Sequence, residues 1–253
     1  MIARGAGPLG GNPFGILILL IVLLALVRGG GLAPPISAVL REPTSSAAWI
    51  AFLGFIVAIA LGITVHEFMH AYTAHRLGDD TGKHMGRLSV DPRAHLDLFG
   101  SMLILLIGFG YGKPVPVNEA RLANGRLGLA LVSLAGPLTN VALAAVAALP
   151  LRAGAADVVG GAYAQVLALV VAYNCLLAVF NLIPIPPLDG SKVVYGLLPA
   201  HHAYTWRTYE QYGPFILIAA IFLLPYVGIQ LLGPLVFEPA RLLTEILVGR
   251  PLF

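Results

Sequence analysis

Two histidines and a glutamate at positions 66–70 are the residues of this chain best suited to chemistry. The run His66-Glu67-Phe68-Met69-His70 has the H-E-x-x-H spacing. Residues four apart lie on one face of a helix, so both imidazoles can reach one zinc ion. Glu67 lies one residue further round the helix, where its carboxylate can act as the base that activates water. Five-residue patterns also arise by chance, so this match alone is a weak signal.

The residues that precede the motif strengthen the metal interpretation. Residues 47–65 contain no charged side chain, and these nineteen residues would form roughly 28 Å of helix at 1.5 Å per residue. His66 is therefore expected near the edge of the hydrocarbon layer of a membrane. Ionisable groups at that depth cost several kcal/mol unless they face a polar cavity or a metal ion. The pattern predicts a functional site.

Asp189 is the candidate for the third ligand that a catalytic zinc ion requires. It follows a long apolar run, in a segment where three of the four residues 184–187 are proline. Prolines cannot continue a helix, and irregular backbone at membrane depth is tolerated only where it lines a cavity. Asp-Gly is also a common turn, and Asp can cap a following helix, here residues 191–198. The two histidines need a third ligand to hold a catalytic zinc ion, and this need favours the metal interpretation of Asp189.

The elements that position these residues are predicted to be membrane helices. Hydrophobic residues make up 58% of the chain and charged residues 11%, whereas a soluble chain carries about a quarter charged residues. Such a chain cannot cover a surface that faces water, so the lipid bilayer is its expected surrounding. The net charge of +3 is too small and too widely spread to indicate a nucleic-acid partner.

The predicted fold class is an all-α polytopic membrane protein with about five transmembrane helices, a re-entrant segment and a short β-edge strand near the active site. We divide the chain into an N-terminal transmembrane helix and loop (1–46), a catalytic membrane core (47–200), and a C-terminal helix with an interfacial amphipathic tail (201–253). The apolar runs are residues 14–27, 47–65, 127–149, 162–183 and 215–232, and the tail helix is expected over 235–248.

Residues 98–110 are expected to enter the membrane and return on the same side. The segment has thirteen residues, fewer than the ~20 that a crossing helix needs. His70 and Asp189 each follow an apolar run, so their helices must run in the same direction for both residues to reach one metal ion. A further crossing by this segment would put them on opposite sides. Ten of the fifteen Lys and Arg residues then lie on the side of the active site, which predicts that it faces the cytoplasm.

The chain resembles the site-2 protease family of intramembrane zinc metalloproteases, in a compact form without PDZ or CBS domains. The H-E-x-x-H run and residues 181–190 match the two signature motifs of that family, and residues 112–118 (GKPVPVN) and 135–140 (AGPLTN) match further. The matches cover about residues 50–200. The resemblance implies one zinc ion per chain, held by His66, His70 and Asp189, with Glu67 as catalytic base. It also implies transmembrane proteins or peptides as substrates.

Several other polar residues need an interpretation. Asn181 lies two helical turns before Asp189 and is a candidate donor to the oxyanion of the reaction, although an amide that joins helices is an equal alternative. Asn140 and Asn174 are expected to join helices. We exclude from the metal site the histidines that lie off the motif face or in polar connections, where solvated histidines are usual: His75, His84, His95, His201 and His202.

The alternation of proline and valine in residues 113–118 predicts a strand that can pair along one edge only. The valines direct their backbone groups to one side, and the prolines leave the other side without donors. Such an edge could hold a substrate peptide that has been unwound for cleavage. A stiff surface loop is the alternative for this segment.

Two other functions use the same residues. A catalytically silent relative or a transporter-like protein could use the buried polar groups for binding, because broken helices with polar residues also occur in transporters. A membrane zinc hydrolase of non-peptide amides would share every residue discussed here and is disfavoured by the family resemblance alone.

Overall fold

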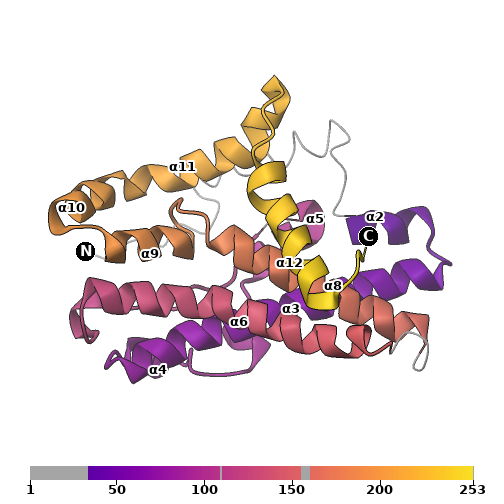
Figure 1. Cartoon of the computed structure of the whole chain (residues 1–253), viewed down its shortest axis with the longest axis horizontal. Coiled ribbons are helices and arrows are strands. Elements are labelled where there is room, and N and C mark those ends of the chain that lie inside the picture. Colours follow the sequence, from indigo (N-terminus) through magenta and orange to yellow (C-terminus); the bar gives the residue numbers. More distant parts are fainter. Residues whose placement is uncertain (1–33, 109, 155–159, 253) are drawn as a thin grey trace, which may run out of the picture.

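The computed structural model describes residues 34–108, 110–154 and 160–252, and this part of the chain is mostly helical (Figure 1). In these residues three helices are long and apolar enough to cross a membrane: α3 (Ser46–Arg76), α6 (Arg126–Arg152) and α8 (Gly161–Asn181). Each of the three contacts the other two. They form the bundle on which the site is built. The apolar run 14–27, a predicted crossing helix, lies outside the described residues.

Helix α3 carries the two histidines without interruption. The side chain of Ser45 accepts a hydrogen bond from the backbone N–H of Ala48 (3.3 Å) and caps the first turn. The helix then continues for 31 residues to Arg76. His66 and His70 therefore lie on consecutive turns of one rigid element.

Small residues allow the three helices to approach closely. A Cβ atom added at Gly62 of α3 would lie 2.8 Å from Asn174 Oδ1 and 2.8 Å from Leu177 Cδ1 of α8. Ala58 and Ala144 are fully buried in the same core, where Val171 and Cys175 of α8 also pack. This packing of small residues brings backbones together, as is usual for helices within membranes.

The backbone unwinds after α8, as the prolines predict. Helix α8 ends at Asn181, and the next helix, α9 (Asp189–Leu197), begins at Asp189. Leu188 occupies the cap position of α9 and makes no side-chain cap hydrogen bond. Asp189 is thus the first residue of a helix rather than its cap, and its carboxylate is available to other partners.

The two ends of the short apolar segment lie together. Helix α5 (Leu98–Ile107) starts at the cap Asp97 and ends at Gly108, which adopts a left-handed conformation. Leu96 and Gly112 form an isolated antiparallel bridge, and the N–H of Lys113 donates to the carbonyl of His95 (2.6 Å). Within the described residues this bridge is the only β-pairing, so the segment 113–118 has no strand partner among them.

The C-terminal part differs from the predicted last crossing helix. Helix α11 (Gly213–Ile218) continues as irregular helical turns to Val227, where Gly228 takes a left-handed conformation and ends the stretch. The predicted continuation to residue 232 is wrong, because a left-handed residue terminates a helix. The tail helix, predicted over 235–248, is α12 (Glu238–Val248), and Figure 1 shows it crossing α8, which it contacts along with α6.

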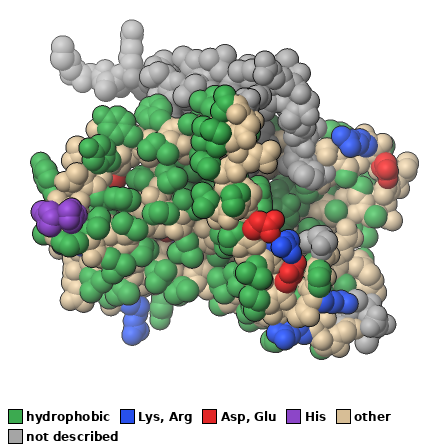
Figure 2. Space-filling view, turned by 45° about the horizontal axis from the view of Figure 1, so that its top comes forward, with side chains coloured by type: hydrophobic (Ala, Val, Ile, Leu, Met, Phe, Trp, Pro, Cys, Tyr) green, Lys and Arg blue, Asp and Glu red, His purple; other side chains and the backbone are tan. Residues whose placement is uncertain are grey.

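Large apolar side chains cover the outside of the bundle. Leu53 and Leu61 of α3 and Val146 and Leu149 of α6 are 44–65% exposed. Figure 2 shows one face of the molecule, on which hydrophobic side chains predominate and charged ones are few. A surface of this kind is stable in lipid rather than in water. Together with the three apolar helices it identifies a membrane protein.

A buried carboxylate ties the end of α3 to the segment that precedes α6. Asp79 is 1% exposed and accepts hydrogen bonds from the N–H of Thr81 (3.0 Å), the hydroxyl of Thr81 (2.5 Å) and the N–H of Asn118 (2.6 Å). Burial alone would raise the pKa of Asp79. The hydrogen bonds from Thr81 and Asn118 and the charge of Arg121 outweigh burial and hold the pKa below its ordinary value.

We expect Asp79→Asn to destabilise the protein by about 1–3 kcal/mol at neutral pH, because charge-assisted hydrogen bonds to a buried group are lost. A lowered pKa stabilises the folded state above the unfolded-state pKa and ceases to do so as pH falls through the folded-state pKa. The difference between wild type and variant should therefore shrink below pH ~4. Unfolding in detergent micelles at several pH values measures both effects.

The neighbouring Asp80→Asn is the matched control, because the Asp80 carboxylate is half-exposed and pairs with the partly exposed His75. A change within ~1 kcal/mol is expected for this control. Equal losses in the free energy of unfolding for the two variants would show that the buried hydrogen bonds of Asp79 contribute no more to stability than the exposed pair of Asp80.

Candidate metal centre

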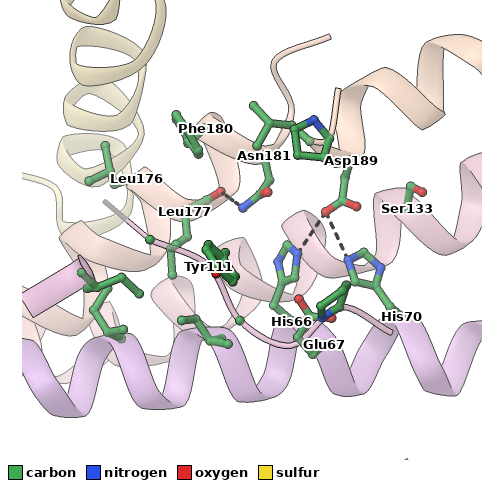
Figure 3. Close-up of a pocket in the computed structure, with 18 of the residues that line it drawn as sticks. His66, Glu67, His70, Tyr111, Ser133, Leu176, Leu177, Phe180, Asn181 and Asp189 are labelled. Carbon is green, nitrogen blue, oxygen red and sulfur yellow. Dashed lines mark hydrogen bonds and ion pairs between the residues drawn. The ribbon is translucent and has the colours of Figure 1, made fainter. Parts of the chain in front are cut away.

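Three predicted ligands meet at one point in the bundle. The Nε2 atom of His66 lies 3.0 Å from Asp189 Oδ2, and the Nε2 atom of His70 lies 3.1 Å from the same oxygen. Figure 3 shows both imidazoles rising from α3 towards the Asp189 carboxylate. The three residues are 5–7% exposed, and their ligand atoms all lie within 4.8 Å of one another. The sequence prediction that these residues come together is therefore matched by the geometry.

Helix α6 closes the site from a third side. A Cβ atom added at Gly136 would lie 2.6 Å from Nε2 of His70 and 2.7 Å from Cε1 of His66. Only glycine allows the helix to lie this close to the two rings. Gly136 belongs to the A-G-P run of α6, whose sequence matches a family motif, and it thus has a steric role at the site.

The second nitrogen of each imidazole is held by a hydrogen bond. His70 Nδ1 lies 2.7 Å from the carbonyl oxygen of Val132, and His66 Nδ1 lies 2.6 Å from Asn140 Oδ1. A carbonyl oxygen can only accept, so Nδ1 of His70 carries a proton, which leaves Nε2, the nitrogen that faces Asp189, as the one that can bind a metal ion. Metal-binding histidines are usually oriented in this way.

The donor set fits a catalytic zinc ion. Two neutral imidazole nitrogens and one carboxylate oxygen are the ligands of the His₂-carboxylate class, in which the fourth position remains open for water. The other oxygen of Asp189, Oδ1, lies 3.6 Å from Nζ of Lys192. Asp189 thus directs one oxygen to the histidines and the other to a lysine, which suits a carboxylate that binds through a single oxygen.

Glu67 lies beside the three ligands and faces the same cavity. Its Oε2 atom accepts a hydrogen bond from the backbone N–H of Val115 (3.2 Å). The cavity has a volume of about 600 Å³ and contains Glu67, Val115 and the three candidate ligands in its wall. The rest of the wall is largely apolar, formed by side chains of α3, α5 and α8 and of the segment before α12: Phe55, Ile59, Ile63, Ile104, Tyr173, Leu176, Leu177, Phe180, Leu232, Val236 and Phe237.

Asn181 also lines the cavity, near Asp189 in Figure 3. Its Nδ2 atom donates to the carbonyl oxygen of Leu177 within the same helix (3.0 Å). The amide therefore has one donor engaged in α8 and is not among the three converging groups. Its role as an oxyanion donor stays a prediction.

The excluded histidines lie away from the converging groups. His75 pairs with Asp80, and His84, His201 and His202 are exposed. His95 is fully buried, with Nε2 2.6 Å from the carbonyl oxygen of Ser89, so the expectation of a solvated His95 is wrong. The bridge between Leu96 and Gly112 folds the chain over this residue, a non-local contact that the local sequence does not contain.

Sequence reasoning missed two contributors to the site. The carbonyl of Val132 orients His70, and no sequence signal identifies a backbone atom on another helix. Lys192 lies three residues after Asp189, on the same face of α9, and this helical spacing was a usable signal.

Comparisons with known proteins agree with this geometry. Residues 150–224 match the model of Peptidase family M50. The chain is 37% identical over 188 residues to "Putative zinc metalloprotease YwhC" of Bacillus subtilis (strain 168), an alignment that covers 71% of this chain and 84% of that protein. It is 35% identical over 163 residues to "Putative zinc metalloprotease Rip2" of Mycobacterium tuberculosis (strain ATCC 25618 / H37Rv), covering 60% of each. No solved structure matches the chain.

Proposed function

Because the chain belongs to the site-2 protease family, peptidase family M50, and is a zinc metalloprotease of a membrane, we propose that it hydrolyses peptide bonds of transmembrane substrates with Glu67 as base. One observation carries the proposal. His66, His70 and Asp189 converge beside Glu67 in a cavity whose wall is mostly apolar. A transporter-like or silent relative would need neither the third ligand nor a carboxylate at this place.

The three converging residues would hold the zinc ion, and the other groups would act on substrate and protons. Bound zinc supplies a Lewis acid that polarises the scissile carbonyl and lowers the pKa of water at the site. Glu67 takes the proton from the attacking water and passes it to the leaving amide nitrogen. The second N–H of the Asn181 amide is the proposed donor to the developing oxyanion. The apolar wall limits the access of bulk water and strengthens these interactions.

The same proposal includes the orientation of the protein. We place the protein in the cytoplasmic membrane with about five crossing helices over the whole chain, and the active site of its catalytic core, residues 47–200, towards the cytoplasm. The re-entrant interpretation of residues 98–110 is supported by the bridge between Leu96 and Gly112, because a segment whose ends touch returns to the side from which it entered.

We also propose that residues 113–118 hold the unwound substrate. Val115 lines the cavity, and its N–H donates to Glu67. The donor edge of the segment therefore points at the proposed base. A substrate strand paired along this edge would take over the N–H of Val115 from Glu67 and bring a peptide bond next to that carboxylate, which supports β-addition over a plain surface loop.

Removing the base should separate metal binding from chemistry. Glu67→Gln should keep about one zinc ion per chain, and turnover should fall by roughly 10²- to 10⁴-fold. Asp189→Ala should lose both zinc and turnover. Metal analysis of the purified protein measures zinc. Turnover is measured on transmembrane precursors that accumulate in membranes of cells carrying Glu67→Gln.

The exposed Glu238→Gln on α12 is the control, and it should retain zinc and turnover. Full zinc content and activity in Asp189→Ala would contradict the ligand assignment. Undiminished turnover in Glu67→Gln would contradict the role of the base.

Cysteine labelling tests the re-entrant segment. In a Cys175→Ala background, Val90→Cys and Ala120→Cys flank the segment at exposed positions, and both should react with a membrane-impermeant maleimide from the cytoplasmic side. Ala153→Cys, at the opposite end of α6, should react from the other side and serves as the control. Labelling of residues 90 and 120 from opposite sides would contradict the proposal.

The substrate edge is tested by removing a single donor. Val115→Pro deletes the N–H that faces Glu67, whereas Val115→Ala shortens the side chain and keeps that N–H. We expect the proline variant to bind zinc normally and to cleave a helical transmembrane substrate at least ~10-fold more slowly, because unpaired substrate groups are costly in a dry site. The alanine variant should remain near wild type. Equal cleavage by the two variants would argue for a plain loop.

A further inference from the structure

Two asparagines that are not metal candidates connect the site to α8. Asn140 of α6 and Asn174 of α8 are both fully buried in the apolar bundle. Asn174 Nδ2 donates to the carbonyl oxygen of Val170 (2.8 Å), and Asn140 Nδ2 donates to Asn174 Oδ1 (2.8 Å). Asn140 Oδ1 in turn lies 2.6 Å from Nδ1 of His66. These contacts form a continuous line of hydrogen bonds that ends at a candidate ligand.

The direction of this line is set by a backbone atom. The carbonyl of Val170 can only accept, so Asn174 must present its NH₂ group to Val170 and its oxygen to Asn140. Asn140 must then present its NH₂ group to Asn174. The second hydrogen of that group is used as well, because Asn140 Nδ2 also donates to the carbonyl oxygen of Gly62 on α3 (3.1 Å).

Rotating the Asn140 amide by half a turn would be costly. Its oxygen would then face the oxygens of Gly62 and Asn174, and acceptors that face each other in a buried site lose their hydrogen bonds. The oxygen of Asn140 therefore stays towards His66, which must donate from Nδ1. The nitrogen of His66 left to bind a metal ion is consequently Nε2, the atom that faces Asp189.

We propose that Asn140 and Asn174 are positioning residues that select the zinc-binding tautomer of His66. The inference rests on the proposed function, in which His66 holds the ion. Helix α6 orients His70 directly through the carbonyl of Val132. The orientation of His66 is set by the carbonyl of Val170, which acts through the side-chain amides of Asn174 and Asn140. One histidine is thus oriented by α6 alone, and the other by an amide of α6 that is held in place by α8 and α3.

A role in helix packing alone predicts a different result. Both asparagines join helices, so their replacement lowers stability whatever their role at the site. The orienting role adds an effect on metal affinity, because loss of a partner that orients a ligand typically weakens metal binding 10- to 100-fold. The two roles are separated by comparing metal affinity with the stability of the metal-free protein.

The experiment measures the zinc dissociation constant of the full chain in detergent by competition with a chelator. Asn140→Leu, which offers no acceptor to His66, should bind zinc 10- to 100-fold more weakly than wild type. In Asn140→Asp the side chain still accepts a hydrogen bond from His66, so zinc affinity should be within about threefold of wild type. This variant loses both N–H donors of the amide, so without metal it should be no more stable than Asn140→Leu. Thr139→Val, the neighbouring residue on α6, should leave affinity unchanged.

Asn174→Ala tests the distant part of the line, because it leaves the Asn140 amide without one of its two orienting partners. Its zinc affinity should lie between the affinities of wild type and Asn140→Leu. The double variant should bind no more weakly than Asn140→Leu, because Asn174 acts through Asn140. If the leucine variant does not fold, the comparison of Asn174→Ala with Asn140→Asp decides the matter.

Wild-type affinity in Asn140→Leu or Asn174→Ala would overturn the inference, as would equal losses in Asn140→Asp and Asn140→Leu. Failure of the proposed function has a different signature. In that case wild type would not bind zinc stoichiometrically, or His70→Ala would bind it as tightly as wild type does.

Discussion

The convergence of two imidazoles and a carboxylate inside an apolar bundle is the interaction on which the rest of the structure depends. Ionisable groups in such surroundings are expensive unless each has a partner, and here one oxygen of Asp189 lies within 3.1 Å of both histidines. His66 and His70 need one unbroken helix, which α3 supplies. Asp189, in contrast, reaches the site because the backbone unwinds between α8 and this residue. The prolines after α8 cause that unwinding.

Close helix packing makes this arrangement possible. The absence of a side chain at Gly136 lets α6 reach the imidazoles, and the absence of one at Gly62 lets the Asn174 amide approach α3. These contacts bring backbone carbonyls and buried amides to the outer nitrogens of the two rings. In an apolar bundle such groups are the available partners, so the packing of the helices also sets the orientation of the candidate ligands.

The cavity joins this polar centre to the apolar interior. Glu67 and Asn181 lie on its wall together with leucine, isoleucine and aromatic side chains. A soluble peptide gains little from such surroundings, whereas an apolar segment from a membrane can enter without loss of burial. Once unwound it needs hydrogen-bond partners, and the donor of Val115 faces the point where chemistry would occur. The largely apolar wall of the cavity therefore supports the proposal that the substrate is taken from the bilayer.

The sequence by itself determined the features that depend on neighbouring residues. The helix that carries His66 and His70, the unwinding before Asp189 and the membrane surroundings follow from spacing, proline content and uncharged runs. Tertiary structure alone decided the features that join distant residues. The partners of His66 and His70 and the burial of His95 belong to this second group. So does the finding that residues 113–118 pair with no strand among the residues that the structure describes. Hydrogen-bond partners 60 or more residues apart are chosen by how three helices pack, and no local pattern of side chains encodes that choice.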